Sequence, residues 1–212
     1  MNLDELLTTT RTVRKRLDLE RAVERSVIEE CVRIAMQSPT GANSQGWQWV
    51  FVEDAAAKAK LADIYRKQFD VTYRVNPIAT SDDPKVQAQN VRRRESAVHL
   101  ADNFQHVPII MVPCAPGRLE GAATGAQAAF WGSLLPAVWS FMLALRARGL
   151  GSAWVTMNLS REGGEQETAE ALGIPFERYT QAGMFPVAYT KGTDFKPIAT
   201  KPVDEVIHWD RW

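Results

Sequence analysis

One long uncharged segment constrains the fold of this chain more than any other feature. No charged residue occurs between Glu120 and Arg146, and residues 128–145 are long enough to cross the hydrocarbon core of a membrane. The segment is interrupted by Gln127, Ser133, Pro136 and Ser140. Charge-rich amphipathic sequence flanks it and no second span occurs, so we expect a helix that protein, not lipid, covers on all sides. A second copy of the chain is a natural cover.

Composition excludes several classes of protein. The 212 residues are 45% hydrophobic and 24% charged, which suits one domain with a sizeable core. The 25 basic side chains balance 25 acidic ones, so nothing favours a nucleic-acid partner. Cys31 and Cys114 stand alone, which indicates neither a disulfide framework nor a metal site. The first residues lack the pattern of a secretory signal, and we therefore expect a cytoplasmic protein without a membrane anchor.

Hydrophobic periodicity predicts an α+β domain. Helices are expected over residues 3–16, 24–37, 55–69, 85–104, 122–148 and 165–172, and strands over 47–52, 107–114, 152–157 and 182–189. Residues 71–84 have no clear period and are expected to form a mobile connection. No linker divides the chain, and the strands are not joined by repeated βα units, so a single α+β domain over residues 1–212 is predicted.

Two segments carry residue types suited to a ligand. Residues 11–16 form a basic knot whose Arg forks suit a terminal phosphate, although a solvated basic helix end explains them equally well. Residues 38–47 concentrate amides, hydroxyls and glycines before a strand, and the side chains of Asn43 and Gln45 offer both donors and acceptors. The alternative for this second segment is a turn that satisfies its own backbone. The run Arg92–Arg94 is more simply a solvated face.

No catalytic acid–base set is visible. The phosphate-binding glycine motifs are absent, nothing places a His beside Ser44, and His99, His106 and His208 are scattered. Such a chain, if it is an enzyme, is expected to let an organic cofactor supply the reactive centre.

Five motifs in order resemble the FMN-dependent nitroreductase family. They are Arg-Thr-Val-Arg at 11–14, Ser-Pro-Thr-Gly-Ala-Asn-Ser-Gln-Gly-Trp at 38–47, Arg-Gly-Leu-Gly-Ser-Ala-Trp at 148–154, Leu-Gly-Ile-Pro at 172–175, and the terminal Lys-Pro-Val-Asp-Glu-Val-Ile-His-Trp-Asp-Arg-Trp at 201–212. The resemblance runs from about Leu3 to Trp212. It implies a nitroreductase-like fold with a central, mostly antiparallel sheet flanked by helices.

The same resemblance implies an intertwined homodimer with FMN at the subunit interface. Residues 122–148 would form the central dimer helix, and residues 195–212 an extended arm around the partner. The residues that would hold FMN are Arg11, Thr12 and Arg14 at the phosphate and ribityl chain, Thr40, Asn43 and Gln45 along the ribityl chain and ring edge, and Lys201 and Arg211 as further phosphate contacts. Backbone of residues 156–158 would face the flavin N5, and no side chain would be catalytic.

Three departures from the family pattern stand out. Thr10 precedes Arg11 where a second Arg is common, and Ala199 and Thr200 precede Lys201 where more basic residues are common. These changes predict weaker phosphate affinity. Gly46 stands where the family usually has Pro, which loosens the turn.

The reaction implied is transfer of hydride and electrons from NAD(P)H to a nitroaromatic, quinone or similar oxidant, each bound in turn. Two alternatives remain open at this level. One is a specialised flavin enzyme that desaturates or reductively dehalogenates a single metabolite, because one fold hosts several chemistries. The other is a non-catalytic, FMN-binding redox module.

Overall fold

A computed structural model describes residues 1–212. Its centre is an antiparallel five-stranded sheet. The strands are β1 (Gln48–Val52), β2 (Ile109–Pro116), β3 (Leu150–Ser152), β4 (Tyr179–Gln181) and β5 (Phe185–Tyr189). Their order is β1-β2-β5-β3, and β4 pairs with the end of β2. In register, Val50 faces Val112, Met111 faces Phe185 and Gly151 faces Ala188.

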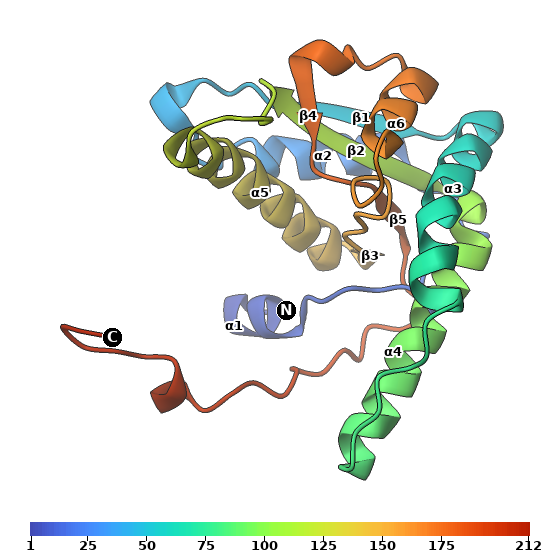
Figure 1. Cartoon of the computed structure of the whole chain (residues 1–212), viewed down its shortest axis with the longest axis vertical. Helices are drawn as coiled ribbons and strands as arrows, with labels where there is room; N and C mark the ends of the chain where they lie inside the picture. The colour runs from blue at the N-terminus through green and yellow to red at the C-terminus, as the bar shows by residue number, and fades with distance from the viewer.

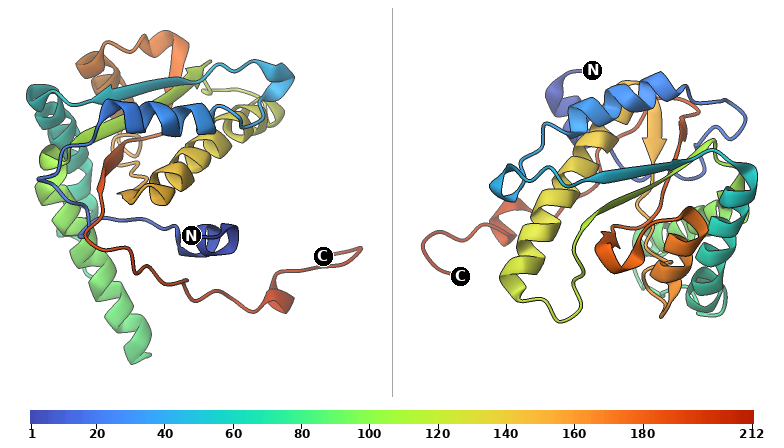
Figure 2. Two further views of the ribbon diagram at one scale, coloured as in Figure 1. Left: turned by 180° about the vertical axis from the view of Figure 1, so that it is seen from behind. Right: turned by 90° about the horizontal axis from the view of Figure 1, so that it is seen from above.

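Helices cover both faces of this sheet (Figure 1). They are α1 (Leu3–Thr9), α2 (Arg25–Ala35), α3 (Ala55–Phe69), α4 (Pro84–Asn103), α5 (Thr124–Ala147) and α6 (Gly164–Leu172), with short helical turns η1 (Gly41–Asn43), η2 (Asp70–Arg74), η3 (Phe104–His106), η4 (Phe176–Arg178) and η5 (Val203–Glu205). Helices α2 and α5 lie together on one side, and α3 and α6 on the other (Figure 2).

Strand β2 divides the core into two halves. Its residues are buried except at the final Pro116, and successive side chains point to opposite faces. Ile110 and Val112 join the cluster under α3 and α4, whereas Ile109 and Met111 join the cluster under α2 and α5. A continuous apolar run therefore builds a strand with protein on both sides.

The sequence predicts the larger elements and misplaces three boundaries. The first helix ends at Thr9, not at residue 16, because the amide of Val13 donates to the carbonyl of Ser152 at 2.8 Å and draws the chain into an extended path. The third strand is residues 150–152, not 152–157, and the expected strand at 182–189 is preceded by the separate strand β4.

Of residues 71–84, expected to form a mobile connection without regular structure, residues 71–74 belong to the helical turn η2 and residues 75–83 run back along α4. The guanidinium of Arg94 donates to the carbonyl of Asn76 at 2.8 Å, and the amide of Asn90 donates to the carbonyl of Ala79 at 3.0 Å. This hairpin of loop and helix projects from the body (Figure 1).

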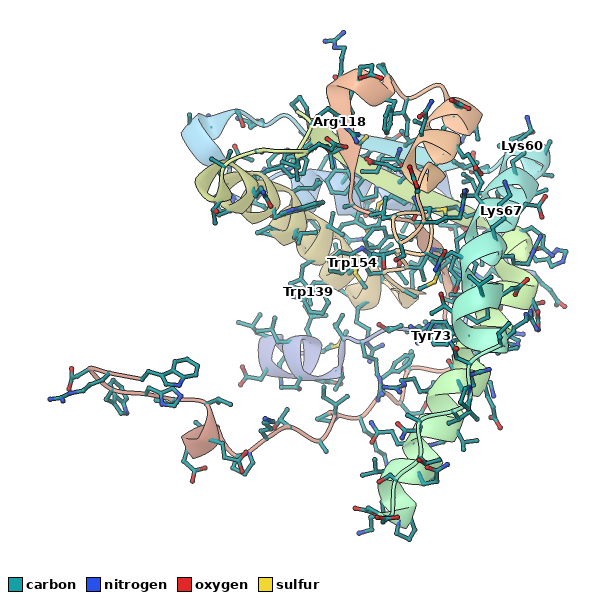
Figure 3. All side chains as sticks on the ribbon, viewed as in Figure 1. Lys60, Lys67, Tyr73, Arg118, Trp139 and Trp154 are labelled. Carbon is teal, nitrogen blue, oxygen red and sulfur yellow. The ribbon has the colours of Figure 1, made fainter.

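One chain alone does not cover α5. Its most apolar 18-residue window has a mean hydropathy of 1.6 and is only 39% buried, and α5 is the one helix here long and apolar enough to cross a membrane. Trp139 is 42% exposed and points away from the sheet (Figure 3). The single chain therefore leaves an apolar strip of α5 open, and the expectation that a second copy covers this helix remains a prediction.

After Lys196, whose carbonyl accepts from Arg11, the chain extends away from the body. Every residue from 196 to 212 is exposed, including Trp209 and Trp212, and the segment extends away from the sheet (Figure 1). We call residues 195–212 the arm.

Candidate functional site

The basic segment 11–16 lies beside the sheet, with residues 11–13 extended and a turn at residues 14–17 in which the amide of Leu17 donates to the carbonyl of Arg14 at 3.1 Å. The amide of Val13 bonds to Ser152, and the carbonyl of Arg16 accepts from the amide of Lys191 at 2.8 Å. Val13 and Leu17 are buried in the core. Thr12 is exposed, whereas Arg14 is half-buried close to Tyr65 and Tyr73.

This arrangement lines a cavity of about 370 Å³ with positive charge. Its charged lining consists of Arg11, Arg14, Lys15, Arg16 and Lys196 against the single acid Asp194, with Thr12 and Ser96 as neutral polar groups. Five cations facing one carboxylate form a site for an anion with several charges.

Arg14 is the cation most available to such an anion. Its side chain is half-buried and has no hydrogen-bond or ion-pair partner, and burial lowers its pKa although the nearby Tyr65 and Tyr73 oppose the shift. Tyr73 lies at the end of a stack of aromatic rings with Phe69, at 5.0 Å between centroids (Figure 3). An arginine with an unused planar fork suits bidentate binding of a phosphate.

The other cations of the cavity are partly engaged. Arg16 donates to the carboxylate of Asp194 at 2.5 Å and to the carbonyl of Lys191 at 2.9 Å. Arg11 donates to the carbonyl of Lys196 at 3.3 Å. Two arginines thus tie the start of the arm to the basic segment.

The amide-bearing loop forms a second polar cluster. Ala42, Asn43 and Gln45 have positive φ of 52°, 52° and 46°, a conformation that non-glycine residues seldom adopt. The Gln45 amide donates to the Asn43 side-chain oxygen at 2.9 Å, and the Gln45 backbone N–H donates to the Thr40 hydroxyl at 3.1 Å. The loop does satisfy part of its own backbone. Asn43 and Gln45 are nevertheless exposed and keep unused donors and acceptors.

Ser133 of α5 anchors this loop. Its hydroxyl accepts from the amide of Gly41 at 3.1 Å, and its carbonyl accepts from the indole of Trp47 at 2.9 Å. A cavity of about 210 Å³ lies between the loop and α5. Gly46 packs closely here: a Cβ at that position would lie 2.9 Å from the ring of Pro116, so a larger residue would force one of the two segments to shift.

The backbone of residues 156–158 also presents unused donors. The N–H groups of Thr156, Met157 and Asn158 make no backbone hydrogen bond. Asn158 is fully buried, and its side-chain oxygen has no partner. Unpaired polar groups at a buried position are a usual sign of a missing ligand or water.

The structure brings together some predicted site residues and separates others. Arg11, Thr12 and Arg14 share one cavity, and Thr40, Asn43 and Gln45 share one loop. The two groups lie at different points along α5: the loop is anchored at Ser133, whereas Arg146, thirteen positions later, contacts Thr9 just before the basic segment. A rise of 1.5 Å per residue separates these two points by about 20 Å.

Lys201 and Arg211 lie on the arm, exposed and far along it from the cavity wall. Within one chain, therefore, neither residue reaches the basic segment. The sequence analysis misses two residues near the basic cavity. Phe195, which lines it, has no periodic neighbours, and Arg146, which contacts Phe195, is visible in the sequence only as the charge that ends the uncharged segment.

A larger cavity, about 620 Å³, lies elsewhere. It opens between α2 and β1, with Trp49 and Phe51 on its wall and the ion pair of Arg25 and Glu53 at its edge. None of the predicted site residues lines it, so its size alone does not make it the site.

The sequence profile described as Nitroreductase family matches residues 7–189, most of the chain. The chain belongs to the nitroreductase family. Comparison with curated protein sequences gives no match.

Solved structures share the fold of this nitroreductase-family chain over its whole length. Iodotyrosine deiodinase, bound to FMN and 3-iodo-L-tyrosine, is 20% identical with a TM-score of 0.70, covering 100% of both chains. A BluB-like flavoprotein from Clostridium difficile 630 is 18% identical with a TM-score of 0.70, again over 100% of both. The FMN and NADPH-dependent nitroreductase NfnB from sphigopyxis sp. strain HMH is 17% identical with a TM-score of 0.69, over 100% of both.

At these identities the structural likeness shows the nitroreductase fold, which confirms the predicted α+β class. The family match and the flavoprotein neighbours together support a flavin oxidoreductase.

Proposed function

We propose that this chain is an FMN-dependent oxidoreductase whose complete site forms between two copies. The observation that carries the proposal is the half-buried, unpaired guanidinium of Arg14 in a cavity lined by five cations. Such a cavity fits the dianionic phosphate of FMN, and it lies on the segment that carries the first family motif.

The residues present fit FMN in three places. Arg11, Thr12 and Arg14 would hold the phosphate, and the loop of Thr40, Asn43 and Gln45 would bind the ribityl chain and the ring edge. The unpaired N–H groups of residues 156–158 would face the ring. Lys201 and Arg211 would add phosphate contacts from the arm.

A homodimer would bring the basic segment of one chain close to the amide loop of the other. In one chain the anchor points of the basic segment and of the amide loop lie about 20 Å apart along α5, so we propose that one flavin uses these groups from two different chains. Packing α5 against a second α5 would cover the open apolar strip and bring the groups of two copies together. The arm also exposes apolar side chains that would pack on the surface of a partner subunit. They are Ile198, Val203, Val206, Ile207, Trp209 and Trp212.

When bound, FMN would supply the redox chemistry between NAD(P)H and a nitroaromatic, quinone or similar oxidant, with the two reactants bound in turn. The protein's part is to position and to stabilise. N–H donors of residues 156–158 and the amides of Asn43 and Gln45 would offset negative charge on the ring. No side chain in the site is arranged as an acid–base pair, so solvent would supply the protons.

A second candidate function is a specialised reaction on one metabolite, such as reductive dehalogenation. The structural neighbour iodotyrosine deiodinase is the observation that favours it. The projecting hairpin of residues 75–103 would then shape a pocket for one metabolite. A narrow substrate profile with poor turnover of generic nitroaromatics and quinones favours this second function. Tight FMN with negligible reduction by nicotinamides favours a non-catalytic redox module.

An absorption spectrum of the purified protein, before and after anaerobic addition of NADH or NADPH, tests the proposal. We expect a yellow protein whose flavin band bleaches with at least one nicotinamide and returns when a quinone is added. A colourless protein that takes up no added FMN would overturn the cofactor assignment. A yellow protein that neither nicotinamide reduces would overturn the reaction. We also propose a cytoplasmic location, where both nicotinamides are present.

A further inference from the structure

Phe195 is the anchor of the arm. Among residues 191–212 it is the only half-buried residue, and all the others are exposed. Two guanidinium groups contact its ring: the Cζ of Arg16 is 4.2 Å from the ring centroid, and the Cζ of Arg146 is 4.6 Å from it. Two cations on one aromatic ring fix both its position and its orientation.

Arg146 is an unusual residue for its position. It is 6% exposed, it lies in the last turn of the most apolar helix, and it forms no ion pair. It donates to the carbonyl of Thr193 at 3.0 Å and to the hydroxyl of Thr9 at 3.5 Å, while its Nε has no partner. Burying a cation without a carboxylate costs stability, and the negative end of α5 offsets only part of this cost. Packing alone therefore does not explain an arginine here.

The contacts of Arg146 lead to the wall of the basic cavity. Arg146 holds Thr193 and Phe195, and between them lies Asp194, whose carboxylate accepts from Arg16. The next residue, Lys196, accepts from Arg11 through its carbonyl. The wall formed by residues 194–196, and the position of two of the cavity's arginines, thus depend on one buried side chain.

We propose that Arg146 is a positioning residue that clamps Phe195, so that the arm leaves the body in one fixed direction and residues 194–196 form the outer wall of the anion cavity. The clamp couples the arm to the ligand: displacing Phe195 frees the arm and misplaces Arg11 and Arg16 together. The coupling to FMN rests on the proposed function, whereas the anchoring of the arm does not.

Limited trypsin digestion measures how firmly Phe195 holds the start of the arm. Lys196 and Lys201 are each followed by proline, which trypsin does not cut, so the bonds after Lys191 and Arg211 are the cleavable ones in the arm region. The carbonyl of Lys191 accepts from Arg16, and release of Phe195 would loosen this bond. Mass spectrometry of the fragment that starts at Gly192 measures its cleavage rate.

Phe195→Leu and Phe195→Tyr form the matched pair, because leucine keeps apolar contact without a π face and tyrosine keeps the ring. We expect Phe195→Leu to be cut about tenfold faster after Lys191 and to bind FMN about tenfold more weakly, with Phe195→Tyr close to the parent in both measurements. Arg146→Met should behave as Phe195→Leu; the Phe195 pair decides the question even if that variant does not fold. Circular dichroism checks that each variant is folded.

Three results would overturn the inference. Parental cleavage and FMN affinity in Phe195→Leu would show that the ring anchors nothing. An equal loss in Phe195→Tyr and Phe195→Leu would show that the cation–ring contacts are not responsible. Faster cleavage with unchanged FMN affinity would refute the coupling. Failure of the parent to bind FMN would instead refute the proposed function, and the cleavage rates would still decide the anchoring.

Discussion

Replacing Arg14 by alanine tests the anion cavity most directly. The half-buried guanidinium has no partner in the protein, so its whole hydrogen-bonding capacity is available to a phosphate. A hydrogen bond to a charged group contributes about 1.5–3 kcal/mol. At about 1.4 kcal/mol per tenfold, Arg14→Ala should raise the Kd for FMN by about 10- to 150-fold.

The stability of the flavin-free protein should change in the other direction. Burial lowers the pKa of Arg14, which means that folding places this cation in a less favourable environment than water provides. Its removal should therefore leave the thermal midpoint of the apoprotein unchanged or slightly higher. Loss of affinity without loss of stability separates a ligand-binding arginine from a structural one.

Arg93→Ala is the matched control, because Arg93 is exposed on α4 and makes no ion pair. Titration of apoprotein with FMN, followed by flavin fluorescence, gives the three Kd values for parent and variants. We expect Arg93→Ala to lie within about twofold of the parent. Equal FMN retention in the two variants would refute the assignment, as would an Arg14→Ala apoprotein that melts far below the parent.

Three further predictions follow from particular contacts. Trp139→Glu puts a charge on the open strip of α5, and gel filtration should show a shift from dimer to monomer with loss of flavin; an unchanged elution volume and flavin content would contradict the dimer face. Gly46→Ala places a methyl group 2.9 Å from Pro116 and should cost about 1–3 kcal/mol, seen as a lower midpoint in chemical denaturation, and an unaltered midpoint would show that Pro116 yields freely. Burial raises the pKa of both Cys31 and Cys114 to about 11, so only about 0.1% of each thiol is ionised at pH 8. Iodoacetamide should label the unfolded chain at pH 8 but hardly the folded one, with labelling rising toward pH 11, and equally fast labelling of both would disprove the burial.

The sequence predicts what periodicity can encode. The apolar run of β2 and the helical spacing of α2 are visible because each pattern repeats within its own element. Strands β3 and β4 have three residues each, too few for a period, and tertiary pairing alone defines them. The basic segment was predicted as helix because Arg and Lys favour helices, but pairing with Ser152 prevails over that local preference.

Site prediction follows the same division. Arg11, Arg14, Asn43 and Gln45 were found because each lies in a contiguous motif. The clamp around Phe195 was not, since its two arginines come from positions 16 and 146 and meet the ring only in the folded chain. Contacts between residues so distant in sequence leave no local pattern.

The open strip of α5 links assembly to folding. In one subunit only 39% of the most apolar window of α5 is buried, so under the proposed dimer a lone subunit would be an aggregation-prone intermediate. Thermal midpoints should then climb with protein concentration, and extreme dilution should release flavin before the helices melt. During synthesis, newly made subunits would rely on rapid encounter with one another, or on chaperones, to avoid aggregation.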